Sequence, residues 1–176
     1  MEPGCPVSLA AVTEASRPAL AHLFQLYAYD WSELLPLDVQ SNGLFPDELF
    51  AKYATEDPER HAFLVYAADR LSGFAIVAER SRLTSEAGVC DMEEFFVLRR
   101  YRRRGLGRAA AVATFNRFPE RRWEVRQRDG NAAATAFWRK VIDTYTAGNY
   151  REVRWNDAAW LGPVQSFGSR SARSSH

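Results

Sequence analysis

The chain has 176 residues, of which 47% are hydrophobic, enough apolar material for one substantial core. Its 23 basic residues nearly balance 22 acidic ones, and the net charge of +1 argues against a protein whose whole surface binds nucleic acid or membranes. With two cysteines and three scattered histidines we expect neither a disulfide framework nor a metal site. No segment approaches the roughly 18 apolar residues of a membrane span, and the first residues lack a basic leader, so we expect a cytoplasmic protein.

The first half of the chain predicts helices followed by a hairpin. Apolar residues at helical spacing through 20–27 predict an amphipathic helix that begins near Pro18. The proline-interrupted stretch after it predicts a loop and a short helix from about Asp47 to Tyr53. Two apolar runs, 63–67 and 73–79, predict a β-hairpin.

The second half alternates strands and helices. A buried strand over 95–98 leads into a helix over 107–117, and a strand over 123–128 precedes a helix capped by Asn131. The stretch TYTAGNYREVRW has two β-prone arms around AGN and predicts a last hairpin. This order predicts an α/β fold with one mixed sheet, in a single domain over 1–168, followed by a disordered serine-rich tail over 169–176.

The stretch RRYRRRGLG joins the strand at 95–98 to the next helix. The first N–H groups of a helix have no partner within it and attract anions. Gly105 and Gly107 remove side chains that would hold a phosphate away and allow the loop to curl, while arginines add fork-shaped donors. We interpret the stretch as a pyrophosphate cradle. The alternatives are a solvated basic loop and a nucleic-acid patch, which the balanced overall charge disfavours.

The segment Arg102–Gly107 resembles the [QR]xxGx[GA] signature of the GNAT family of N-acetyltransferases. The resemblance implies a mostly antiparallel sheet that splays at the cofactor site, flanked by helices, with acetyl-CoA as co-substrate. Main-chain groups of the strand end would pair with the pantetheine arm, and the loop and a second helix would hold the rest of the cofactor. The implied cofactor-binding residues are Phe96, Val97, Leu98, Arg102, Arg103, Arg104, Gly105, Leu106, Gly107, Arg108, Asn131, Ala134, Phe137 and Trp138.

Trp138 departs from the family pattern, because many members have at this position a tyrosine that protonates the departing CoA thiolate. An indole N–H donates a hydrogen bond but is not a usable acid near neutral pH. Tyr145 or water replaces the tyrosine, or the thiolate leaves unassisted. Since adjacent residues do not share one helix face, we expect only one of Phe137 and Trp138 to face inward, and Trp138 is either a core residue or a cofactor contact.

Three carboxylates precede the strand end: Asp91, Glu93 and Glu94 are the candidate catalytic bases. Simple alternation places Asp91 and Glu93 on one face and Glu94 on the other. The family commonly carries a bulge in this strand, which would break that parity. Family resemblance puts Glu94 first, and at least one of the three is expected only to form an ion pair with an arginine.

The resemblance implies transfer of an acetyl group from acetyl-CoA to a primary amine by direct attack in a ternary complex. The backbone N–H of Val97 or its neighbour would polarise the acetyl carbonyl. The acceptor is a small-molecule or peptide amine, for which 27–33 and 145–155 are candidate contact segments, and exposed hairpins suggest a homodimer. The alternative is a non-catalytic acyl-CoA-binding or sensing domain.

Overall fold

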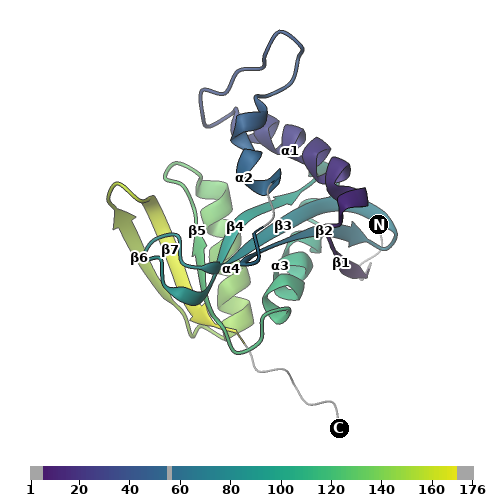
Figure 1. The fold of residues 1–176 in the computed structure, drawn as a ribbon. Coiled ribbons are helices and arrows are strands. Elements are labelled where there is room, and N and C mark those ends of the chain that lie inside the picture. The colour runs from purple at the N-terminus through teal and green to yellow at the C-terminus, as the bar shows by residue number, and fades with distance from the viewer. Residues whose placement is uncertain (1–5, 55–56, 170–176) are drawn as a thin grey trace.

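The computed structural model describes residues 6–54 and 57–169, and its centre is a seven-stranded sheet in the order β1-β2-β3-β4-β5-β7-β6 (Figure 1). The neighbouring strands run antiparallel except β4 and β5, which are parallel, so the predicted mixed, mostly antiparallel sheet is confirmed. The strands are β1 Val7–Ala11, β2 Arg60–Ala67, β3 Arg70–Arg80, β4 Ala87–Val97, β5 Arg122–Arg126, β6 Arg151–Asn156 and β7 Leu161–Gly168.

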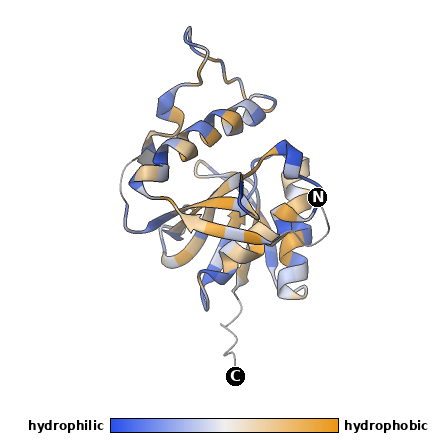
Figure 2. Cartoon of the chain, turned by 90° about the vertical axis from the view of Figure 1, so that its right-hand side faces the viewer, coloured by the Kyte–Doolittle hydropathy of each residue, from blue (hydrophilic) through white to orange (hydrophobic). Residues whose placement is uncertain are grey.

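Helices cover both faces of this sheet. On one face lie α1 (Arg17–Trp31) and the short α2 (Ala51–Ala54), and on the other lie α3 (Leu106–Asn116) and α4 (Ala132–Thr146). The loop between α1 and α2 protrudes beyond them, and apolar residues follow the strands (Figure 2). Each face therefore has its own core. Within the described part of the chain, no helix combines the length and apolar character that membrane crossing requires.

The first half of the chain follows the prediction with one omission. Helix α1 contains the expected apolar stripe, with Leu20, Leu23 and Phe24 buried, and the expected hairpin forms from β2 and β3. The short helix after the loop is a 3₁₀ turn over Asp47–Leu49 followed by α2. Strand β1 was not predicted, because its five residues gain their strand conformation by pairing with β2 at the edge of the sheet.

The predicted hairpin around Ala147–Asn149 is wrong. Its first arm belongs to α4, which continues because Tyr145 packs into the core and Thr144 donates a hydrogen bond to the Lys140 carbonyl 2.8 Å away. Ala147, at φ 54°, ends the helix in the left-handed region. The real hairpin pairs β6 with β7.

The predicted tail also begins too early. Strand β7 extends to Gly168, and the N–H of Ser169 donates to the carbonyl of Arg121 at 2.8 Å. The remainder of the predicted tail, 170–176, lies outside the described residues.

Strand β4 contains the bulge that the resemblance implied. Asp91 pairs with Ala78 and Glu94 with Ile76, with a shift in register between them. Because their partners are two residues apart on β3, Asp91 and Glu94 point to the same face, and the simple alternation is wrong. Strand β5 pairs with β4 over Val89–Asp91, and no pairing with it is found beyond Asp91 in the described chain, so the two strands separate toward Val97.

We expect Gly73→Ala to destabilise the protein by about 1–3 kcal/mol, because a Cβ there would overlap the Phe96 carbonyl oxygen and lie 3.1 Å from the Cα of Val97. Denaturant titration would show a lower midpoint with an unchanged slope. The matched control is Gly168→Ala, where the added Cβ meets nothing within 4 Å. Equal stabilities for the two variants would contradict the prediction.

Candidate active site

Helix α3 begins where the arginine-glycine stretch ends. Gly105 caps the helix at φ 83°, a left-handed conformation that favours glycine, and a Cβ built on it meets nothing within 4 Å. The loop before it also turns through the left-handed region, at Arg103 (φ 58°). The first N–H groups of α3 therefore point out of an open, curled loop, an arrangement that suits a phosphate.

Gly107 lacks the left-handed conformation that we predicted for the curl of the loop. It is absent from the residues with positive φ, and its missing Cβ would lie 3.2 Å from the ring of Phe137 on α4. Its small size thus lets α3 approach α4.

The arginines of the loop divide into two groups. Arg102 donates from Nε to the Val97 carbonyl at 2.6 Å and forms an ion pair with Asp30 of α1, which also pairs with Arg99 at 2.8 Å. Arg103, Arg104 and Arg108 are exposed around the start of α3. Arg102 therefore joins the loop to β4 and α1, while the exposed arginines surround the helix N-terminus.

The end of β4 presents main-chain groups to the gap between β4 and β5. The N–H of Leu98 donates to the Ser72 carbonyl at 2.9 Å, toward β3. Because N–H groups of successive strand residues point to opposite sides, the N–H of Val97 points away from β3 and toward the gap. The side chain of Phe96 is buried in the core between the sheet and α1.

Helix α4 carries the second group of predicted cofactor-binding residues. Asn131 is its N-cap and accepts a hydrogen bond from the N–H of Ala134 at 3.0 Å, as predicted for a cap. Phe137 and Trp138 both contact the ring of Phe95, with centroids 6.0 and 5.0 Å away, so the expectation that only one faces inward is wrong. Trp138 is buried in the core.

Tyr145 lies far from the start of α3. Its hydroxyl is 3.1 Å from Oδ1 of Asn116, the last residue of that helix. Since ten residues of α-helix span about 15 Å, the hydroxyl lies at the opposite end of α3 from the cradle. This position argues against Tyr145 as the replacement for the missing tyrosine.

Asp91 is committed to an ion pair. Arg126 of β5 donates to both of its carboxylate oxygens from Nε and Nη2, at 2.9–3.2 Å, and both side chains are buried. Burial raises the pKa of Asp91, and the guanidinium of Arg126 acts in the opposite direction. The indole ring of Trp160 covers that guanidinium, 4.5 Å from its centroid. Asp91 is therefore held in a buried ion pair that joins β4 to β5.

Glu93 is also paired with cations, and Glu94 is not. Glu93 accepts from Lys52 at 3.2 Å and from Arg60 at 2.6 Å. Glu94 instead accepts from two tyrosines: the hydroxyl of Tyr27 reaches Oε2 at 2.6 Å and that of Tyr53 reaches Oε1 at 2.5 Å. Within the described residues, Glu94 has no basic partner within salt-bridge distance.

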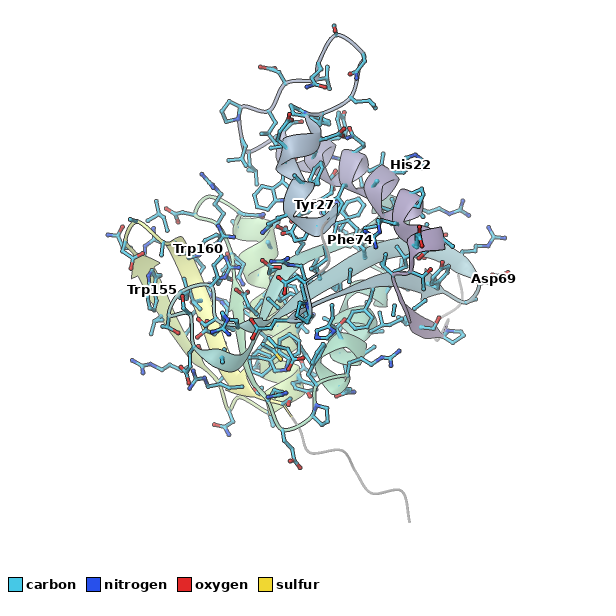
Figure 3. All side chains as sticks on the ribbon, in the orientation of Figure 1. His22, Tyr27, Asp69, Phe74, Trp155 and Trp160 are labelled. Carbon is cyan, nitrogen blue, oxygen red and sulfur yellow. The ribbon has the colours of Figure 1, made fainter. Side chains whose placement is uncertain are left out.

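Tyr27 and Tyr53 were not identified as site residues of this carboxylate from the sequence. Tyr27 comes from α1 and lies beside Phe74 of β3, with ring centroids 5.5 Å apart (Figure 3). One signal was present, since Tyr27 is on the apolar stripe of α1 and a tyrosine facing a core needs a hydrogen-bond partner. Burial and the nearby Glu94 raise the pKa of both tyrosines, so they remain protonated donors.

Three solved structures illustrate the likeness to known proteins. An acetyltransferase from Thermus thermophilus is 20% identical, with 92% of this chain and 96% of that chain covered and a TM-score of 0.66. Spermidine N-acetyltransferase from Vibrio cholerae, in complex with CoA and spermine, is 11% identical over 93% and 95%, with a TM-score of 0.59. The ribosomal-protein-S18-alanine N-acetyltransferase from Escherichia coli is 14% identical over 97% and 99%, with a TM-score of 0.56. These likenesses establish the fold.

Family membership rests on the sequence. None of the curated proteins compared with the chain matches it. The family model described as "Acetyltransferase (GNAT) family" matches residues 18–142, which include α1, the bulged strand β4, the loop before α3 and most of α4. The chain therefore belongs to the GNAT family of acetyl-CoA-dependent N-acetyltransferases.

Proposed function

We propose that this protein transfers the acetyl group of acetyl-CoA to a primary amine by direct attack, and that Glu94 accepts the proton released by the amine. One observation carries the assignment of Glu94: of the three carboxylates on β4, it is the one whose charge no described cation balances. An ammonium acceptor would supply the missing positive charge. Asp91 and Glu93 already have arginine or lysine partners, so they are no longer proposed as bases.

The described residues fit acetyl-CoA. The N–H groups at the start of α3 and the exposed Arg103, Arg104 and Arg108 would hold its pyrophosphate. The pantetheine arm would lie in the gap between β4 and β5, along the strand end 96–98, with α4 and Phe137 beyond it. When bound there, the cofactor supplies an acetyl thioester.

The chain's own groups account for two parts of the chemistry. The N–H of Val97, which points into the gap, would donate to the developing oxyanion. Glu94 lies on the face covered by α1 and α2, and would take the proton from the amine directly or through a water molecule. Neither Trp138, which is an indole in the core, nor Tyr145 supplies an acid, so we assign protonation of the thiolate to solvent.

We base the acceptor class on two structural neighbours and on the contacts of Glu94. The spermidine N-acetyltransferase and the S18-alanine N-acetyltransferase are named for amine-bearing acceptors, one a polyamine and one a protein residue. For this chain we propose a cationic amine that contacts Glu94 between α1 and the β6–β7 turn, where Trp160 covers Arg126.

We expect Gly105→Glu to abolish binding of both acetyl-CoA and CoA in calorimetric titration, because it places a negative side chain and a strained left-handed residue in the cradle. Gly43→Glu is a matched control, since that glycine has φ 79° with nothing within 4 Å of its added Cβ and lies in the loop after α1. The control should bind like the wild type. Wild-type protein that binds neither ligand would overturn the proposed cofactor site.

The transfer reaction itself is tested by release of free CoA thiol over a panel of amines that includes polyamines, amino acids and peptides. Turnover should require an acceptor with a primary amine and should fail with its acetylated or dimethylated form. Tight binding of acetyl-CoA without turnover on any amine would contradict the proposed activity and would favour a binding domain.

A further inference from the structure

The two oxygens of the Glu94 carboxylate are held separately, by hydroxyls from two different helices. Tyr27 reaches Oε2 from α1, and Tyr53 reaches Oε1 from α2. We propose that Tyr27 and Tyr53 are positioning residues that fix the orientation of Glu94, an inference that rests on the proposed role of Glu94 as the base. A carboxylate offers about four lone-pair sites, so two donors leave the others to the acceptor amine.

Both tyrosine rings are locked by aromatic packing. The ring of Tyr53 lies on that of Phe24, with centroids 5.1 Å apart and planes inclined by 12°. The ring of Tyr27 is nearly perpendicular to those of Phe74 and Trp31, with centroids 5.5 and 5.9 Å away. Because the rings cannot swing without disturbing this cluster, the two hydroxyls define one position for the carboxylate.

The charged groups around the site do not replace these donors. On α2 and β2, Lys52 and Arg60 bond to Glu93, and on β5, Arg126 bonds to Asp91. The face of α1 presents Tyr27, whose own proton is retained because burial and Glu94 raise its pKa. Neutral hydroxyls therefore make the direct contacts to Glu94, and a donor to a carboxylate stabilises the ionised form over the acid.

Tyr53 also connects the site to the α1–α2 loop. It belongs to α2, a single turn of helix that follows the protruding loop, and its hydroxyl bridges 41 residues of sequence to Glu94. Both hydroxyls therefore contact the Glu94 carboxylate when α2 packs on the sheet. This makes the docking of α2 part of the preparation of the site for the acceptor.

The experiment compares Tyr27→Phe, Tyr53→Phe and the double variant, each of which keeps the aromatic ring and removes the hydroxyl. The first readout needs no substrate: in protein labelled with ¹³C at glutamate side chains, the Glu94 resonance is assigned by its loss in Glu94→Gln and followed against pH. We expect its titration to move to higher pH in each variant and further in the double variant. The acidic limb of the plot of kcat/KM against pH should also move to higher pH.

The second readout is the effect of each substitution on kcat compared with its effect on the KM for acetyl-CoA. We expect kcat to fall by about 10- to 100-fold, with little change in the KM for acetyl-CoA, because the base is misplaced while the cofactor site is untouched. Tyr66→Phe is the matched control, since Tyr66 lies on β2 and packs against the same apolar cluster, outside the candidate acceptor segments. Thermal unfolding checks that each variant is folded.

Different results would overturn the positioning role of the two tyrosines and the role of Glu94 as the base. An unmoved Glu94 titration together with wild-type kcat in the double variant overturns the positioning role, whatever the activity of Glu94→Gln. Full turnover by Glu94→Gln instead removes Glu94 from the reaction, and the ¹³C titration still reports whether the hydroxyls hold its carboxylate.

Discussion

Glu94→Gln is expected to lower kcat/KM for the amine by about 10²- to 10⁴-fold while leaving the affinity for CoA unchanged. Glutamine has nearly the same shape, and its amide still bonds to the hydroxyls of Tyr27 and Tyr53, so the fold is retained. What is lost is the one carboxylate on β4 whose charge is free to meet an ammonium. Steady-state kinetics with the best amine of the panel measures the loss.

The pH dependence of this loss is a sharper test than its size. At a pH near the usual amine pKa of about 10.4, about half of a primary amine is already deprotonated in solution, so a protein base matters less there. We therefore expect the deficit of Glu94→Gln to shrink as pH rises toward the pKa of the acceptor. Turnover equal to that of the wild type across the whole pH range would remove Glu94 from the base role.

Glu93→Gln is the matched control for this variant, because it makes the same change one residue away on the same strand. Glu93 is bonded to Lys52 and Arg60, and in the variant Arg60 keeps Asp57 as an ion-pair partner. We expect kcat/KM within a few-fold of the wild type. A large loss in this variant and none in Glu94→Gln would exchange the roles of the two residues.

The proposed cofactor site could be predicted from the sequence because its parts are neighbours along the chain. The strand end, the curled loop with Gly105 and the start of α3 are contiguous, and each depends on backbone conformations that neighbouring residues dictate. Gly107 shows the limit of such reasoning. Its role depends on Phe137, thirty residues later, so only the packing of α4 on α3 reveals it.

The acceptor side was only partly readable, because it is assembled from distant segments. The two carboxylates Asp91 and Glu94 share a face through a bulge that the residue pattern alone does not require. The choice among the carboxylates is made by partners 35 to 67 residues away: Arg126 through the register of β4 and β5, and Tyr27 through the docking of α1. Family resemblance put Glu94 first, and these contacts support our proposal that it is the base.

The mistaken hairpin has a similar cause. Thr144, Tyr145 and Thr146 favour strands when considered locally. In the structure the two threonine hydroxyls bond back to carbonyls one turn earlier, and Tyr145 fills the core against Phe115. Tertiary packing thus extends α4 to a left-handed cap at Ala147, against the local preference of these residues.

Arg126→Met is expected to destabilise the protein by about 3–5 kcal/mol near neutral pH, because it leaves the buried carboxylate of Asp91 without its bidentate partner. Denaturant unfolding at several pH values measures it. Burial already raises the pKa of Asp91, and removal of the guanidinium that opposes this shift raises it further. Since a raised folded-state pKa favours folding below the unfolded pKa of about 3.9, the deficit should be smallest in acid and grow as pH rises.

Two further variants separate the lost ion pair from lost packing. Asp91→Asn in the Arg126→Met background should recover part of the stability and flatten the pH dependence, because no buried charge remains. Arg80→Met makes the same substitution at an exposed pair, in which Arg80 binds both oxygens of Glu59, and should change stability little. A deficit that is independent of pH and is not rescued by Asp91→Asn would show that Arg126 stabilises through packing under Trp160. In that case the contact with Arg126 would no longer be a reason to exclude Asp91 as the base. The burial of Asp91 would be the remaining reason.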